Sequence, residues 1–331
     1  MTALHIRRRA FLASSLATGL AALAPAVHAQ GDRPPLKLLV GFPPGGASDS
    51  IARVLADKLP QILKQTVVVE NRPGVGGRIA AQAVKNAAPD GNTLMLAPDA
   101  TFVFQHLTYP VEVLGYDMTK DFSAIARVNS YPVAMVVSAA TGARNVKEYV
   151  AWRRTAAGQP TFGTAGLGGD THFNGLQFGK LTGVEMTVVP YRGNAPLIND
   201  LLGGQIMAGN LVAGDVAQHV KSGKLNYIGV FAGKRSSLLP DVPTLLEQGV
   251  DTGGDDAWMG VWGPAKMPAA EVQRLSDAIR QALAMPDVRD TLLTRFLQLP
   301  DYRPGAEVDR QLAAQLVHWG PIIKASGFKP Q

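Results

Sequence analysis

The stretch LLVGFPPGGASDSIARVLADKL, residues 38–59, changes character halfway along. Its start continues a short apolar run from residue 36, which predicts a buried β-strand over residues 36–40. Glycines and prolines then end the strand, and apolar residues recur at helical spacing over residues 50–63. A Gly-rich loop between a strand and a helix exposes unpaired N–H groups and the positive end of the helix dipole. This pattern favours an anion-binding loop.

A second loop of the same kind lies about one small domain further along. Residues 41–49 read GFPPGGASD and residues 163–171 read GTAGLGGDT. Each ends in a hydroxyl residue and an acid, which suit N-capping of the following helix. Open α/β sheets bind ligands at the carboxyl ends of their strands. The two loops therefore predict two lobes that face each other across one ligand-binding cleft.

Strand-like and helix-like segments alternate along the chain. Short apolar strands separated by helices predict an α/β fold with parallel sheets covered by helices on both faces. We expect strands at residues 36–40, 67–70, 93–97, 133–138, 161–164, 188–191, 205–212, 225–231 and 258–262, and helices at 50–63, 78–87, 146–155, 172–181 and 196–202. We expect the tail, residues 271–324, to be mostly helical.

The first 29 residues have the pattern of an export signal. A basic start, an alanine-rich apolar run and the small-residue end Val27-His28-Ala29 predict a signal peptide over residues 1–29. The pair Arg8-Arg9 resembles a twin-arginine signal. The alternative is a membrane anchor, for which the apolar run is short. Removing this segment takes away three arginines, so the mature charge is +6 − 3 = +3. We expect a periplasmic protein, with too mild a charge to indicate nucleic-acid binding.

Motifs for cofactors, metals and catalysis are missing from the sequence. The chain has no cysteine, no P-loop, no G-x-S-x-G and no H-E-x-x-H, and residues 71–77 lack G-x-G-x-x-G spacing. The histidines have no metal-ligand spacing. We expect His172 to orient the second Gly-rich loop. Asp49 and Asp170 form a candidate carboxylate pair for acid–base chemistry, although both also fit N-caps.

Over nearly the whole mature length, the chain resembles the extracytoplasmic solute receptors of tripartite tricarboxylate transporters, also called Bug receptors. No single motif carries the resemblance, but the ordered series does. The matching stretches are residues 41–49, residues 69–77 (VENRPGVGG), Ala88-Pro-Asp-Gly91, residues 189–193 (VPYRG), residues 200–205 (DLLGGQ), residues 239–244 (LPDVPT) and Trp319-Gly320.

The resemblance implies a two-lobed Venus-flytrap of the type II periplasmic binding class, each lobe a mainly parallel sheet covered by helices. It implies residues 31–128 plus 254–331 as lobe 1 and residues 129–253 as lobe 2. It also implies a small carboxylate gripped between the lobes, with Asp49 meeting an ammonium group or a water of the ligand. The implied binding residues are Phe42, Gly46, Ala47, Ser48 and Asp49 on one wall, Thr164, Ala165, Gly166 and Gly168 on the other, and Thr101 pointing inward.

The sequence departs from the family pattern at three acids. Asp99 stands in a loop that commonly carries serine and glycine, Asp170 replaces a small polar residue, and Asp215 ends the unusual segment NLVAGD. We include Asp99 and Asp170 among the expected binding residues. Capping or solvent exposure is the alternative for all three. If they face the cleft, they repel dicarboxylates and tricarboxylates by about 1 kcal/mol per charge pair, which favours an amino-bearing or neutral polar ligand.

The expected function is capture of a small organic acid or amino-acid-like ligand for membrane subunits of a secondary transporter. We expect a monomer without catalytic residues, cofactor or metal. Two alternatives stay open: a sensor that reports the ligand to a signalling system, and an exported hydrolase that uses Asp49 and Asp170.

Overall fold

The computed structural model describes residues 33–254 and 256–329. The predicted signal peptide, residues 1–29, lies outside the described residues. The segment Pro35–Gln331 forms one unit. Among the described residues, no helix is long and apolar enough to cross a membrane.

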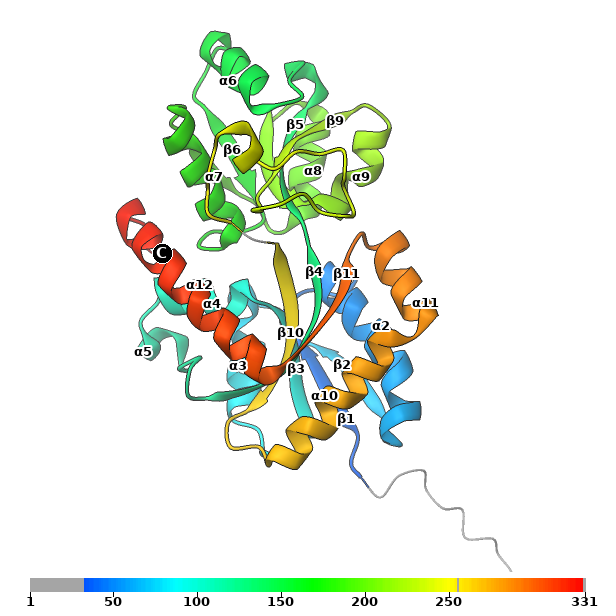
Figure 1. Ribbon diagram of the computed structural model, residues 1–331. Coiled ribbons are helices and arrows are strands. Elements are labelled where there is room, and N and C mark those ends of the chain that lie inside the picture. The colour runs from blue at the N-terminus through cyan, green and yellow to red at the C-terminus, as the bar shows by residue number, and fades with distance from the viewer. Residues whose placement is uncertain (1–32, 255, 330–331) are drawn as a thin grey trace, which may run out of the picture. The chain divides into compact units, whose positions relative to one another are not determined.

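The first sheet has six strands within the described residues, in the order β11-β4-β10-β3-β1-β2 (Figure 1). β1 pairs in parallel with β2 and β3, whereas β10 and β11 pair antiparallel with their neighbours. The strands are β1 (Leu36–Val40), β2 (Val67–Asn71), β3 (Thr93–Pro98), β4 (Phe122–Tyr131), β10 (Ala257–Pro264) and β11 (Leu299–Pro304). The helices that follow or cover them are α2 (Ala47–Leu63), α3 (Arg78–Lys85), α4 (Ala100–Thr108), α5 (Val111–Leu114), α10 (Ala269–Ala284), α11 (Pro286–Asp290) and α12 (Gly305–Ser326).

The second sheet has five strands in the described part of the chain, in the order β7-β6-β8-β5-β9. β6 pairs in parallel with β7 and β8, and β5 runs antiparallel to β8 and β9. The strands are β5 (Val133–Ser138), β6 (Thr161–Thr164), β7 (Thr187–Pro190), β8 (Ala208–Val212) and β9 (Leu225–Val230). Their helices are α6 (Val146–Thr155), α7 (Asp170–Thr182), α8 (Asn194–Gly203) and α9 (Ala213–Lys221).

The chain passes twice between the two sheets. Pro132 alone separates β4 of the first sheet from β5 of the second, and the return runs from the end of β9 at Val230 to the start of β10 at Ala257. The two-lobed α/β architecture is therefore confirmed. The sheets are mixed rather than mainly parallel, because β4, β5 and β10, the strands that flank the crossings, lie antiparallel to their neighbours.

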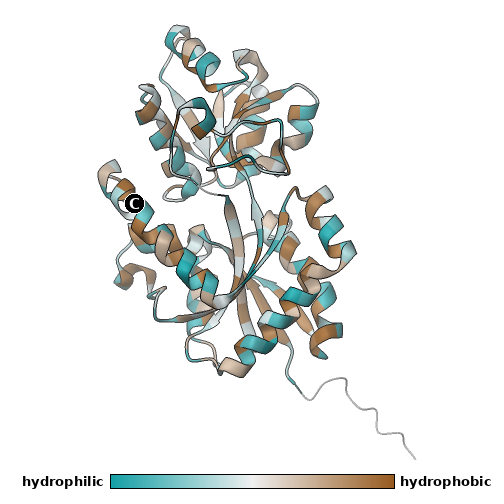
Figure 2. Cartoon of the chain, viewed as in Figure 1, coloured by the Kyte–Doolittle hydropathy of each residue, from teal (hydrophilic) through white to brown (hydrophobic). Residues whose placement is uncertain are grey.

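Apolar strands supply the core. All eight residues of β10, AWMGVWGP, are buried, as expected for a central strand covered on both faces. Figure 2 shows apolar residues along the strands of the first sheet and polar residues along much of α10 and α12. One continuous apolar cluster contains Leu38 and Val40 of the first sheet together with Val137 and Phe162 of the second. The two lobes thus share part of their core.

Candidate functional site

The first Gly-rich loop connects β1 to α2. The helix begins at Ala47 with Gly46 as its N-cap, and no side chain caps it. Ser48 and Asp49, expected as caps, lie inside the first turn and are buried. The expectation of a side-chain cap is therefore wrong here, because the glycine takes the cap position. The first amide groups of α2 are left for water or a ligand.

The Asp49 carboxylate is held by hydrogen bonds within the protein. Its carboxylate accepts hydrogen bonds from the Gly45 amide at 2.9 Å, from Arg53 Nε at 2.9 Å and from Asn71 Nδ2 at 2.9 Å. Burial opposes its charged form, but these donors outweigh burial and lower the pKa of Asp49. These hydrogen bonds give Asp49 a role in shaping the loop, and its expected contact with the ligand stays a prediction. The hydrogen bonds also remove Asp49 as a free acid or base for the hydrolase alternative.

Neighbouring loops complete the first wall. The half-buried Phe42 accepts a hydrogen bond on its carbonyl from Asn71 Nδ2 at 3.1 Å. Thr101, fully buried in α4, donates from Oγ1 to the Gly76 carbonyl at 3.1 Å. Gly41 lies so close to Gly77 that a Cβ at Gly41 would sit 2.4 Å from the Gly77 Cα. The loops after β1, β2 and β3 are thereby held together as one surface.

The second Gly-rich loop connects β6 to α7. Thr164 Oγ1 donates to the Gly166 carbonyl at 3.1 Å and lies 2.5 Å from Thr171 Oγ1. Gly166 has a φ of 147°, a conformation that requires glycine. Ala165 is exposed at the tip, and the helix starts at Asp170 behind the N-cap Gly169, again without a side-chain cap. Both predicted walls therefore end in a helix start capped by glycine.

His172 orients this loop, as predicted. The Gly168 amide donates to His172 Nδ1 at 3.1 Å. Burial lowers the pKa of His172 to about 4, so the ring is neutral and its Nδ1 is an acceptor at neutral pH.

Asp99 and Asp170 line one cavity of about 300 Å³. Asp99 caps α4 by accepting from the Ala100 amide at 2.9 Å, and its other oxygen accepts from Gln315 Nε2 at 2.7 Å. Burial and the charge of Asp170 raise the pKa of Asp99 to about 7. Burial also raises the pKa of Asp170. Asp215 is exposed, accepts from Asn194 Nδ2 at 2.5 Å and does not line this cavity.

Residues that were not predicted supply the rest of the cavity wall. Asn174 lies one helical turn after Asp170, a spacing that brings both side chains to one face. Most of the other lining residues come from α12, more than 200 positions after Asp99 in the sequence, and no local pattern marks them. The additional lining residues are Phe104, Asn174, Gly253, Ala257, Gln311, Ala314, Gln315, His318 and Trp319.

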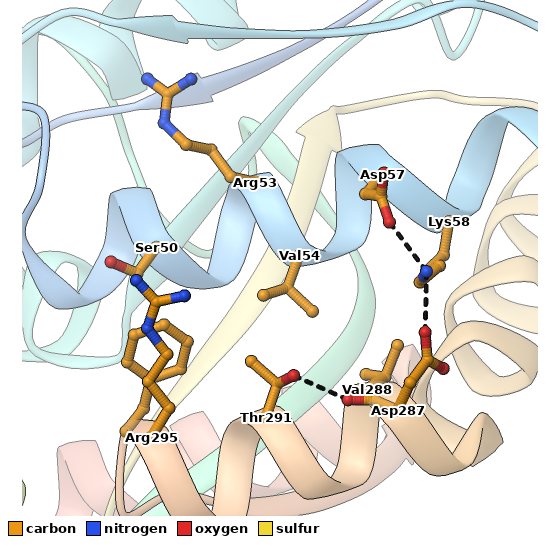
Figure 3. A pocket seen from close by; sticks show the side chains of 10 residues that line it. Ser50, Arg53, Val54, Asp57, Lys58, Asp287, Val288, Thr291 and Arg295 are labelled. Atoms are coloured by element: carbon orange, nitrogen blue, oxygen red, sulfur yellow. Dashed lines mark hydrogen bonds and ion pairs between the residues drawn. The ribbon is translucent and has the colours of Figure 1, made fainter.

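A separate groove of about 330 Å³ runs between α2 and α11. Lys58 bridges Asp57 and Asp287 at 2.8 Å each across its end (Figure 3). None of the expected binding residues lines this groove, so it does not belong to the predicted site. Among the described residues, no group of three or more His, Asp or Glu is placed to hold a metal.

Comparison with known proteins identifies the family. The model of the tripartite tricarboxylate transporter family receptor matches residues 51–328. This chain belongs to that family. A protein encoded in the gbd 5′ region of Cupriavidus necator is 35% identical over 317 residues, which cover 94% of this chain and 93% of the relative.

Solved structures of similar proteins agree with this family of receptors. The periplasmic binding protein BugD is 28% identical with a TM-score of 0.79, covering 91% of this chain and 100% of BugD. MatC from Rhodopseudomonas palustris with bound malate is 26% identical with a TM-score of 0.77, covering 88% and 100%. A protein of R. palustris with adipate is 26% identical with a TM-score of 0.81, covering 91% and 99%. The chain is a solute-binding receptor of the tripartite tricarboxylate transporter family.

Proposed function

We propose that this receptor binds a small organic carboxylate at the starts of α2 and α7, in the periplasm, and delivers it to membrane subunits of a tripartite tricarboxylate transporter. We place the lobes at residues 31–128 plus 254–331 and residues 129–253, with the first boundary inside β4, three residues before the crossing at Pro132. The receptor acts as a monomer and catalyses no reaction. The membrane partner and the compartment are inferred from the family, and the bound malate and adipate of its relatives support the ligand class.

One observation carries the ligand site. Both helices follow a Gly-rich loop, both have glycine at the N-cap, and neither has a side-chain cap. Backbone amides and the helix dipole then offer donors to a carboxylate at each helix start. At α7 the Asp170 carboxylate also accepts from its own amide and from the Thr171 amide. Phe42, Gly46, Ala47 and Ser48 form the first wall, and Thr164, Ala165, Gly166 and Gly168 the second. Asp49 and Thr101 hold the loops in shape.

Isothermal titration of ligand-stripped protein against malate, adipate and a panel of smaller carboxylates tests this proposal. We expect saturable binding of at least one compound with one site per chain. If none of them binds and the protein turns one over, the proposal is wrong.

A backbone variant tests the helix start itself. Ala47 is the first residue of α2, where proline is well tolerated, so Ala47→Pro removes one N–H donor and keeps the helix. We expect roughly a tenfold or greater loss of affinity, the value of one hydrogen bond to a charged group. Ala269→Pro makes the same change at the first position of α10 and should leave affinity unchanged. Equal affinity in both variants would exclude α2 as the carboxylate site.

A further inference from the structure

The walls of the cavity between α4, α7 and α12 are rich in hydrogen-bond acceptors. Asp99 and Asp170 place two carboxylates there. Asn174 is only 3% exposed, and its Oδ1 is buried without a hydrogen-bond partner. Gln315 Oε1 is also buried without one. Buried acceptors without donors are costly, so the wall of this cavity has an unmet demand for hydrogen-bond donors.

The orientation of Gln315 follows from its partner. Its Nε2 donates to Asp99 Oδ2 at 2.7 Å, and a rotated amide would place two oxygens against each other. The Oε1 atom is therefore the end of the amide that lacks a donor. The cavity thus combines two carboxylates with two amide oxygens.

Within the described part of the chain, neither acid forms a salt bridge with a cationic side chain, although the charge of Arg127 lowers the pKa of Asp99. Arg127 is committed to Asp301 at 2.7 Å and to Gln311 Oε1 at 2.9 Å, and it does not line the cavity. His172 is neutral. His318 lines the cavity from the exposed side of α12. A positively charged occupant supplies the charge compensation that Asp99 and Asp170 do not receive from a salt bridge.

Aromatic rings close another side of the cavity. Phe104 and Trp319 both line it, with their ring centroids 5.0 Å apart. The face of an indole or phenyl ring attracts an ammonium group. Carboxylates and aromatic rings in one cavity wall are the chemistry that suits a protonated amine.

We propose that this cavity binds the protonated amino group of the transported solute, so that the solute is an amino-substituted carboxylate. The inference rests on the proposed function. Asp170 is both the first residue of α7 and a wall of the cavity, so a carboxylate at the helix start and an ammonium group in the cavity are neighbours. The ammonium group also offsets the repulsion between Asp170 and the carboxylate of the solute.

Matched pairs of compounds that differ by one amino group test the inference. Ligand-stripped protein is titrated at pH 8 with succinate and aspartate, butanoate and 4-aminobutanoate, and hexanoate and 6-aminohexanoate. We expect the amino member of at least one pair to bind about tenfold or more tightly than its partner, as one hydrogen bond to a charged group would give. If carboxylates bind but no amino group improves affinity, this inference is overturned and the proposed function stands. If none of these carboxylates nor malate nor adipate binds, the proposed function fails.

A variant assigns the effect to the cavity. Asp170→Asn removes the charge and keeps the shape, so the preference for the amino member should fall about tenfold or more. Asp241→Asn, at an exposed loop residue, should keep the full preference. A preference that survives unchanged in Asp170→Asn overturns the assignment. If Asp170→Asn does not fold, the titrations of the unmodified protein with the paired compounds still decide whether the solute carries an amino group.

Discussion

At the scale of single residues, Asp99 gives the protein a defined dependence on pH. Its pKa is raised to about 7 by burial and by Asp170, against the opposing effects of Gln315, Arg127 and the Ala100 amide. The folded state then binds more protons than the unfolded state between about pH 4 and pH 7. The stability contributed by Asp99 is therefore complete below pH 4 and is lost as pH rises through 7.

Replacing Asp99 by asparagine tests this dependence. Asparagine also caps helices, so Asp99→Asn keeps the start of α4. Between pH 4.5 and 7.5 we expect the unfolding free energy of the wild type to fall relative to that of Asp99→Asn, by an amount on the order of a few kcal/mol. Urea unfolding at several pH values measures the difference. Asp241→Asn serves as the exposed control, and parallel curves for wild type and Asp99→Asn would refute the raised pKa.

The acids also show what a sequence can predict about a site. Asp49 and Asp170 both follow a Gly-rich loop in the sequence, and the local difference is the residue one turn later, Arg53 in one helix and Asn174 in the other. Asp49 is satisfied by Asn71, 22 positions away, and by Arg53 one turn along its own helix. Asp170 instead meets Asp99, which comes from the other lobe. The loops were predictable from local pattern, but the partners of each carboxylate depend on the tertiary fold.

At the scale of elements, the close approach of two loops makes Gly41 a sensitive position. A Cβ there would meet backbone atoms of Gly77, which cannot rotate away as a side chain can. We expect Gly41→Ala to lower the unfolding free energy by about 1–3 kcal/mol, as overpacking does. In the same loop, a Cβ at Gly46 has its nearest neighbour, the Pro43 carbonyl oxygen, at 3.6 Å. Gly46→Ala should cost less than about 1 kcal/mol, and equal losses in urea unfolding would contradict this account.

The elements that were predicted and those that were missed differ in how local their signals are. The expected strands 133–138 and 161–164 and helix 146–155 match β5, β6 and α6. β4 was missed, because its apolar pattern is broken by Arg127 and Asn129, whose partners Gln311 and Gln298 lie 184 and 169 positions away. β11 lies within the tail that was expected to be mostly helical. It has prolines at two of its six positions and lies at an edge of the sheet, where proline is tolerated.

At the scale of the whole molecule, a solute held by both lobes should stabilise both together. The two crossings and the shared apolar cluster connect the two sheets. Tryptophan fluorescence can follow the unfolding of each lobe separately. Trp258 and Trp262 lie on β10 and Trp319 on α12, in the first lobe, whereas Trp152 lies on α6 of the second lobe beside Tyr149. The fluorescence of the Trp152→Phe variant therefore reports the unfolding of the first lobe. The fluorescence of the wild type minus that of the variant reports the unfolding of the second lobe.

Ligand at 100 times its Kd should raise the unfolding free energy by about 2.7 kcal/mol. Both fluorescence signals should move to the same higher urea midpoint, because a two-walled site releases its ligand only when the lobes unfold together. A ligand that shifts the first-lobe signal alone would place the whole site on the loops after β1, β2 and β3. A shift of the Trp152 signal alone would place it on the loop before α7. Either result would exclude a site that needs the starts of both α2 and α7, whereas a common shift is the outcome that a clamp between two glycine-capped helices requires.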